Sequence, residues 1–384
     1  MIDLSDFYLR IQEQLDLNLP FVAYRKASNS ISHEPLKGFF QKDDQTHLIH
    51  DFEESGFVFA PFDNERDSFL IPSDESEFLE TDFQIDENEF DNPISTDVEI
   101  ESEGEKQNHI DLVDRGLDAI KNGTLKKVVL SRKEQVKLET PNALSLFRKM
   151  LSKYPTAFVY LWYHPKVGMW LGATPETLLQ IKRNRLKTMA LAGTQKIEET
   201  TEVEWGLKEI EEQEFVTNSI IENIGELDLD KNDILKSGPY TVQAGKLLHL
   251  RTDISVKIDD KVKLVQLIQA IHPTPAICGL PKKVAKEFIL KHENYEREFY
   301  TGFLGELNIK EKVQRSSNRK NRENQAYLSV VKQTSLFVNL RCLKLEEDKA
   351  NLYVGGGITK DSDPEQEWVE TMNKARTMKA VLVK

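Results

Sequence analysis

Two stretches of the sequence carry carboxylates at helical spacing. Glu367, Glu370 and Lys374 are three and four residues apart, which places them on one face of a helix, and Glu209 and Glu212 repeat the three-residue step. A solvated helix face with an ordinary glutamate–lysine pair has the same spacing. If both acidic faces lined one cleft, the carboxylates would repel one another, and a hard cation such as Mg²⁺ would relieve that cost.

A lysine and a glutamate are candidates for a base and an acid. On a strand KKVVLSR, Lys127, Val129 and Ser131 face one side, and burial in an apolar core would favour the neutral amine that can act as a general base. The alternative is a lysine in solvent at a strand edge. Glu176 ends the small-residue segment GATPE, and in a desolvated cleft it would stay protonated and serve as a general acid. The alternative is a turn glutamate in water.

Other segments suit an anionic ligand. The bends at Leu191–Thr194 and Gly355–Gly357 let the backbone approach an anion closely, although tight turns use glycine routinely. Arg341 lies in an apolar context, and a buried arginine needs an anion, either a structural carboxylate or a substrate carboxylate. His249 also lies in an apolar context, where a histidine is usually a hydrogen-bonded core residue. Two prolines make His272–Ala276 a rigid bend.

Elements along the chain must bring these residues together. Apolar residues at helical spacing predict helices over Leu4–Leu17, His109–Asn122, Asn142–Tyr154, Thr201–Ile224, Lys263–Ile271, Lys282–Lys291 and Asp363–Val383. Thr201 with Glu204 forms a capping box, and Asp363 is an N-cap. Apolar runs predict strands over Phe21–Tyr24, Leu48–His50, Gly56–Ala60, Leu125–Arg132, Ala157–His164, Met169–Ala173, Leu178–Ile181, Leu186–Ala192, Gly302–Ile309, Thr334–Leu345 and Tyr353–Ile358. Strands occur in runs rather than alternating with helices, which favours the α+β class.

The composition excludes several classes of function. The 384 residues include 51 basic and 64 acidic side chains, a net charge of −13, which argues against general binding to nucleic acid or anionic membranes. Two cysteines, Cys278 and Cys342, are too few for a disulfide framework and fit a reduced cytoplasmic setting. The sequence shows neither a signal peptide nor an apolar run long enough to span a membrane.

Two charged segments stand out. Fourteen of the 32 residues in 74–105 are acidic and none is Lys or Arg, which is typical of a solvated connector. Residues 310–325 are strongly basic and are interpreted as an exposed hairpin extension. An acidic scaffold protein whose partner binds this basic segment is the alternative from another class of function.

Ten motifs in order carry a family resemblance. They are KVVLSR, LGATPE, LAGT, KEIEEQEFV, LLHL, HPTPAICGLPK, YEREFYTGFLGEL, LRC, YVGGGI and DPEQEWVETMNK. From Leu125 to the C-terminus the chain resembles the chorismate-utilising enzymes, and among them most closely the isochorismate synthases. The resemblance implies addition of water at C2 of chorismate with loss of the C4 hydroxyl. It leaves open whether the product feeds menaquinone, siderophore or salicylate production.

The resemblance also implies roles for individual residues. Glu212 and Glu370 would hold Mg²⁺, with Glu209 and Glu367 completing the site through waters. Gln213 stands where a histidine is common, and Glu211 is adjacent, which leaves the register of this helix open. Lys127 would be the base and Glu176 the acid. The implied substrate-binding residues are Gly193, Thr194, His249, Ala276, Ile277, Tyr300, Arg341, Gly355 and Lys374.

Other reactions of the family fit less well. Anthranilate synthase uses ammonia and lacks a lysine at the Lys127 position. Aminodeoxychorismate synthases often carry a lysine where this chain has Ala192. Salicylate synthase shares the lysine base and goes on to eliminate pyruvate. In salicylate synthases the segment matching HPTPA usually ends in Thr, whereas this chain has Ala276, which counts against that activity. These enzymes also use a tyrosine that matches Tyr300, and salicylate synthase is therefore the second candidate. A catalytically dead homologue would be expected to lack one of the acid, base or metal residues.

The resemblance finally implies a fold and an assembly. We expect two large antiparallel sheets packed together, with helices outside and the cleft between the sheets. Residues 1–105 would supply peripheral strands and the acidic connector of the same fold, and residues 106–384 the catalytic region. We expect a cytoplasmic monomer with chorismate as its substrate and without an amidotransferase subunit.

Overall fold

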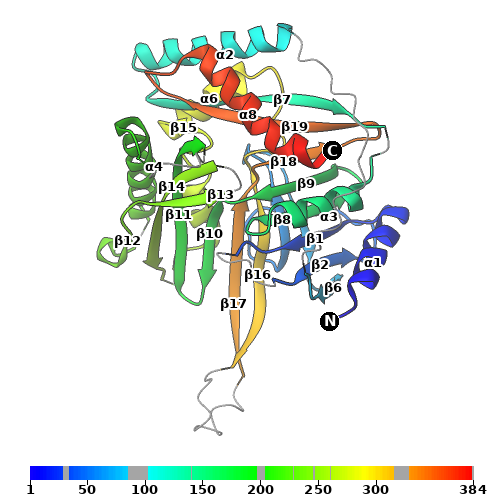
Figure 1. The fold of residues 1–384 in the computed structure, drawn as a ribbon. Coiled ribbons are helices and arrows are strands. Elements are labelled where there is room, and N and C mark those ends of the chain that lie inside the picture. The colour runs from blue at the N-terminus through cyan, green and yellow to red at the C-terminus, as the bar shows by residue number, and fades with distance from the viewer. Residues whose placement is uncertain are drawn as a thin grey trace.

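The computed structural model describes residues 1–28, 34–84, 103–139, 141–196, 204–227, 229–244, 247–259, 261–314 and 328–382. Within them, two antiparallel sheets pack against each other and helices cover their outer faces (Figure 1). This confirms the α+β class and the two-sheet architecture. Among the described residues, no helix is both long enough and apolar enough to span a lipid bilayer.

The first sheet contains nine strands among the described residues. In spatial order they are β15 (Gly279–Leu280), β7 (Lys127–Lys137), β19 (Lys349–Ile358), β18 (Cys342–Leu345), β9 (Gly168–Thr174), β8 (Phe158–His164), β1 (Phe21–Arg25), β2 (Leu36–Gln41) and β6 (Ser76–Thr81). Successive residues of β7 face opposite sides, as predicted: Val128 and Leu130 contact helix α2 (Glu103–Lys121), whereas Lys127 and Val129 face the other sheet.

The second sheet contains ten strands among the described residues. The main path runs β12 (Leu235–Lys236), β14 (Leu247–Lys257), β11 (Arg185–Lys196), β10 (Thr177–Lys182), β17 (Leu328–Val338), β16 (Phe303–Gln314), β4 (Gly56–Ala60), β5 (Ser68–Pro72) and β3 (His47–Ile49), and β13 (Tyr240–Ala244) pairs with β14. The hairpin of β16 and β17 projects from the body of the protein (Figure 1). The N-terminal strands extend both sheets, and the expected boundary at residue 105 falls inside α2.

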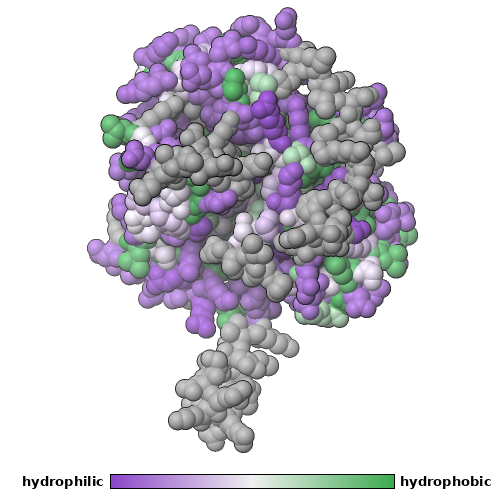
Figure 2. Space-filling view, viewed as in Figure 1, coloured by the Kyte–Doolittle hydropathy of each residue, from purple (hydrophilic) through white to green (hydrophobic). Residues whose placement is uncertain are grey.

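Helices pack on both sheets through apolar side chains. Helices α1 (Leu4–Asp16) and α3 (Ala143–Lys153) and the end of α8 (Pro364–Leu382) bury one cluster against the first sheet. Helices α2 and α6 (Lys282–His292) bury a second against β7. Helices α4 (Leu207–Gly225) and α5 (Leu264–Ile271) pack on the second sheet. The outer face in Figure 2 is mostly hydrophilic where it is described, as the net charge of −13 leads one to expect.

The bounds of several predicted elements differ from those in the structure, and two of the differences concern segments that line the site. Helix α4 begins at Leu207 with an extended Gly206 as N-cap, not at Thr201, which lies outside the described residues. The preceding Trp205 lies in a non-helical segment, and its indole N–H donates to Thr241 Oγ1 on β13 at 2.9 Å. The capping box predicted at Thr201 and Glu204 therefore does not mark the start of this helix.

The predicted strand Thr334–Leu345 is two strands in different sheets. The chain leaves β17 after Val338 and enters β18 of the first sheet at Cys342. Arg341 has φ +48°, which breaks the extended conformation. The buried Asn339 fixes this turn, because its amide donates to Phe299 O and its Oδ1 accepts from the Tyr160 hydroxyl.

The two charged segments are only partly described. Residues 85–102 of the acidic stretch and 315–327 around the basic segment lie outside the described residues. Their expected roles as a connector and a hairpin extension stay predictions.

Candidate active site

A cavity of about 230 Å³ lies between the two sheets. It brings together nearly all of the predicted site residues, which come from segments far apart in the sequence. Those lining it are Glu176, Gly193, Glu209, Glu212, His249, Ala276, Ile277, Tyr300, Arg341, Gly355, Glu367, Glu370 and Lys374. Lys127 lies just behind this lining. Thr194 belongs to β11, but its side chain lies outside the described part of the chain.

The acidic faces of α4 and α8 meet at the glycine strand β19. A Cβ on Gly356 would lie 2.9 Å from Glu367 Oε2, and a Cβ on Gly357 would lie 3.4 Å from Glu212 Oε1. The glycines thus let the carboxylates approach the strand more closely than larger residues would. Glu211 is exposed, so the open register of α4 resolves with Glu209 and Glu212 facing the cavity.

Gln213 has a structural place next to this acidic face. Its side chain is buried, and its amide donates to Ala190 O at 3.0 Å and to Thr252 Oγ1 at 3.1 Å. Gln213 therefore ties α4 to β11 and β14 instead of facing the ligand. The departure from the family pattern at this position leaves the cavity lining intact.

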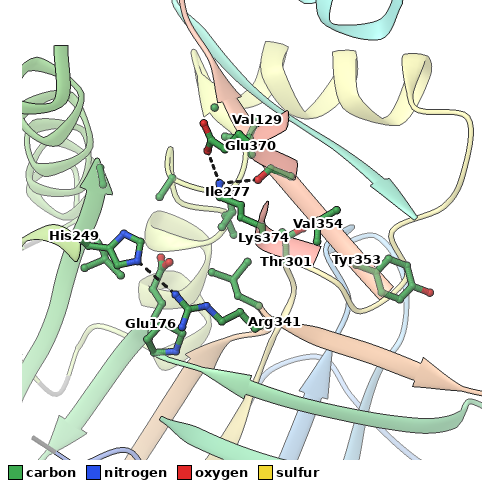
Figure 3. A pocket seen from close by; sticks show the side chains of 18 of the residues that line it. Val129, Glu176, His249, Ile277, Thr301, Arg341, Tyr353, Val354, Glu370 and Lys374 are labelled. Carbon is green, nitrogen blue, oxygen red and sulfur yellow. Dashed lines mark hydrogen bonds and ion pairs between the residues drawn. The ribbon is translucent and has the colours of Figure 1, made fainter. Parts of the chain in front are cut away.

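Two lysines form ion pairs with carboxylates of the two acidic faces. Lys127 is 4% exposed, and its Nζ donates to Glu212 Oε1 at 2.6 Å. Lys374 Nζ lies 2.7 Å from Glu370 Oε1 and donates to Gly355 O at 2.9 Å (Figure 3). The predicted i,i+4 glutamate–lysine pair on α8 is therefore present, and both side chains line the cavity.

The donor set fits a magnesium ion. As they stand, no three His, Cys, Asp or Glu side chains of the described residues form a ready cluster for a metal. Four carboxylates nevertheless face one small cavity, and all-oxygen ligands that leave room for water and a substrate anion are what Mg²⁺ takes. A bound cation would compete with the two lysines for Glu212 and Glu370.

Glu176 is suited to hold a proton. Its side chain is 4% exposed, and burial raises its pKa to about 8, partly offset by the positive charge of Lys127. A carboxyl with this pKa is mostly protonated at neutral pH. The structure thus confirms that Glu176 is desolvated, and its role as a general acid stays a prediction.

Glu176 and Arg341 lie at two adjacent crossings between the sheets. The chain passes from β9 to β10 through Glu176, and from β17 to β18 through Arg341. The crossings are joined by two backbone hydrogen bonds: Val338 N donates to Glu176 O at 3.0 Å, and Ala173 N donates to Arg341 O at 3.1 Å. Acid and guanidinium therefore share one corner of the cavity (Figure 3).

His249 contacts the guanidinium from the second sheet. Its Nδ1 lies 3.0 Å from Gly193 O, and its Nε2 lies 3.4 Å from Arg341 Nη2. A carbonyl only accepts and a guanidinium only donates, which assigns the proton to Nδ1. Burial and the charge of Arg341 lower the pKa of His249 to about 4, so the ring is neutral. His249 orients Arg341 toward the cavity without adding a second charge.

Sequence reasoning missed part of the lining. Thr377 and Met378 on α8 also face the cavity. They follow Lys374 by three and four residues, so helical spacing could have found them. Thr301 and Leu340 lie in irregular segments beside β16 and β17, where the sequence carries no such period.

Comparison with known proteins gives matches to chorismate binding enzymes, both by sequence profile and by individual relatives. The sequence profile described as chorismate binding enzyme matches residues 69–314, and a second profile with that description matches residues 325–380. The isochorismate synthase MenF of Escherichia coli is 30% identical over 283 residues, which are 71% of this chain and 59% of that protein. The chain thus spans less than two thirds of this relative's length.

Two further similarities concern the reaction and the fold. Anthranilate synthase component 1 of Lactococcus lactis is 25% identical over 344 residues, 82% of this chain and 69% of that protein. The solved structure of the menaquinone-specific isochorismate synthase of Escherichia coli superposes with a TM-score of 0.73 at 20% identity, covering 94% of this chain and 88% of that one. At this identity the structural match establishes the fold.

Proposed function

The chain belongs to the family of chorismate binding enzymes, and from this premise we propose that it is an isochorismate synthase, an isomerase that converts chorismate to isochorismate. The similarity to an isochorismate synthase over 71% of the chain supports this activity. We further propose that it acts as a cytoplasmic monomer without an amidotransferase subunit.

One observation carries the proposal: a buried lysine, Lys127, lies directly behind the cavity wall at Gly357, and a buried glutamate, Glu176, whose pKa burial raises to about 8, lies in the lining of the same cavity. Lys127 would take a proton from water as the water oxygen bonds to C2 of the ring. Glu176 would give a proton to the C4 hydroxyl, which leaves as water while the ring double bonds shift. One water enters and one leaves, so substrate and product are isomers and the reaction is reversible.

Basic groups would hold the two substrate carboxylates. Arg341, Lys374 and the backbone at Gly355 lie on the cavity wall, and a guanidinium pairs with a carboxylate through two parallel hydrogen bonds. His249, Ile277 and Tyr300 would surround the ring and its enolpyruvyl group. This arrangement would hold the ring between base and acid.

The carboxylates Glu212 and Glu370, with Glu209 and Glu367, would hold Mg²⁺. When bound, the ion would act as a Lewis acid and an orienting template for the ring carboxylate. The fit of the four-carboxylate set described above supports this part of the proposal.

Salicylate synthase is the second candidate, because Tyr300 faces the cavity. It would need a further step that eliminates pyruvate from isochorismate. Ala276 lies in the same lining at the position where salicylate synthases usually have Thr, which favours a reaction that stops at isochorismate.

Product analysis tests the proposal. Purified protein is incubated with chorismate and Mg²⁺ without ammonia, and the products are separated by chromatography. Isochorismate at a constant ratio to chorismate is the expected result. Equal amounts of salicylate and pyruvate would assign the chain to the second candidate. Turnover that appears only when ammonia is added would overturn both.

A further inference from the structure

A buried ion pair lies directly behind the cavity. Arg297 is 3% exposed and Glu293 is 9% exposed, and both belong to the segment between α6 and β16. Arg297 Nε donates to Glu293 Oε2 at 2.8 Å, and its Nη2 donates to Oε1 at 2.6 Å. Neither residue is among those with an expected role in the reaction. The two parallel bonds fix the plane of the guanidinium.

The remaining donors of Arg297 reach three walls of the cavity. Its Nη2 donates to Val129 O on β7 at 2.7 Å. Its Nη1 donates to Ile277 O at 3.0 Å and to Thr301 Oγ1 at 3.1 Å. Val129, Ile277 and Thr301 all line the cavity and come from different parts of the chain (Figure 3). One side chain therefore sets the spacing of three walls.

Glu293 holds the strand that carries Lys127. Strand β15 pairs with β7 only at Lys127 and Val128, so β7 loses this neighbour farther along. At Ser131 the carboxylate of Glu293 replaces it: Glu293 Oε1 accepts from Ser131 N at 2.8 Å and from Ser131 Oγ at 2.7 Å. The ion pair thus anchors β7 at Val129 and Ser131, two and four residues beyond Lys127.

We propose that Arg297 and Glu293 are positioning residues, which act through the backbone to hold the Lys127 strand against the other walls of the cavity. This inference rests on the proposed function, because its measure is the rate of the isomerisation. A buried ion pair adds little to stability compared with apolar packing, so a stabilising role alone would not require it. A lysine at position 297 would keep the charge but could not make these five hydrogen bonds from one plane.

Arg297→Lys and Ser131→Ala test the inference. Arg297→Lys should lower kcat about 100-fold, since a shift near 1 Å between a reacting group and its substrate costs about that much. The dissociation constant for chorismate should change far less, because the groups that hold the carboxylates stay in place. Ser131→Ala removes the hydroxyl that hydrogen-bonds to Glu293 and to the Tyr295 hydroxyl, keeps the bond from Ser131 N to Glu293, and should lower kcat about fivefold. Each rate is divided by the folded fraction, measured by circular dichroism.

Glu306→Gln is the matched control. Glu306 is also a buried carboxylate in an ion pair, 2.6 Å from Lys26 Nζ, and it accepts from the Tyr24 hydroxyl, but it does not line the cavity. It should lower the melting temperature and leave kcat per folded molecule at the wild-type value.

Each outcome decides one question. Wild-type kcat per folded molecule in Arg297→Lys would overturn the positioning role and leave the proposed function standing. If Arg297→Lys does not fold, an unchanged kcat in Ser131→Ala overturns the role instead. Wild-type protein that forms no isochorismate would overturn the proposed function by itself.

Discussion

The space between the two sheets is filled at one end and hollow at the other. In the filled part, Phe59 stacks on Phe299 with ring centroids 4.3 Å apart, Phe158 stacks on Phe337 at 4.2 Å, and all four side chains are buried. In the hollow part, glycines of β19 leave a cavity lined by carboxylates and basic groups. The same pair of sheets thus forms both a close-packed core and a polar site. Large aromatic side chains fill the space in the first part, and glycines leave it open in the second.

Tyrosines mark the border between the two parts. Tyr353 and Tyr300 line the cavity and stack on each other at 5.5 Å, and Tyr353 also stacks on Trp170 at 5.2 Å. Aromatic rings in such contact are close-packed and leave little room to shift. The filled part is therefore expected to contribute to stability, whereas the residues with proposed roles in the reaction lie in the hollow part. The predictions below test this division.

The largest effect is expected from Lys127→Ala. The variant should lose about 10⁴-fold in kcat, because a positioned base contributes up to that factor, and it should stay folded. Rates are measured by chromatography of the products. Lys126→Ala, which changes the exposed neighbour, should leave the rate unchanged. Retained turnover of Lys127→Ala with an unaltered pH profile would exclude this lysine as the base.

Removing a large ring from the filled part should lower stability and leave the rate unchanged, the reverse of the effect expected for Lys127→Ala. Phe59→Ala should lower the free energy of unfolding by about 3 kcal/mol through the cavity it leaves, with wild-type kcat per folded molecule. Denaturant unfolding measures the free energy of unfolding, and a rate assay measures kcat. Phe78→Ala, at a side chain that is 46% exposed, should cost much less. A large loss of kcat in Phe59→Ala would show that the two parts are not separable.

Glu370→Gln should weaken Mg²⁺ binding roughly 10- to 100-fold, because an amide is a poorer ligand than a carboxylate and tuning of metal sites has this size. The measurement is thermal stabilisation by Mg²⁺ without substrate. Glu365→Gln on the same helix serves as the control, since Glu365 does not line the cavity. Identical Mg²⁺ titrations for Glu370→Gln and wild type would remove Glu370 from the proposed ligands.

The smallest effect is expected from raising the pH by one unit. Burial raises the pKa of Glu176 to about 8, so the acid form is present below that pH and is lost above it. The contribution of Glu176 to kcat/KM should therefore fall about tenfold per pH unit above about 8. This falling limb should be absent from the residual activity of Glu176→Gln. A wild-type profile that stays flat to pH 10 would contradict the assignment of Glu176 as the acid.

Local patterns were sufficient for much of the site. Alternation along β7 separated Lys127 from Val128, and helical spacing on α8 placed Glu367, Glu370 and Lys374 on one face, because both patterns follow from backbone geometry. That the two acidic faces meet at one cavity came from the family resemblance, since spacing within a helix says nothing about its neighbours.

Two tertiary features, the crossing at Arg341 and the contacts of Arg297, could not be predicted from the sequence. Apolar residues occur along the whole run from Thr334 to Leu345, so it resembles one strand, and the sequence does not signal that Arg341 takes a positive φ where the chain passes between two sheets. The role inferred for Arg297 depends on carbonyl groups of Val129 and Ile277, which are distant in the sequence and carry no side-chain signature. Backbone acceptors of this kind become visible only in three dimensions.

The paired crossings between the sheets have a consequence for dynamics. The amide of Ala173 donates to Arg341 O, and the amide of Val338 donates to Glu176 O, so each bond joins one crossing to the other. Neither amide can take up deuterium from solvent unless this corner opens. Deuterium uptake at Ala173 and Val338 would therefore report on the separation of the two sheets. A ligand that contacts both crossings should lower the exchange rates of the two amides together.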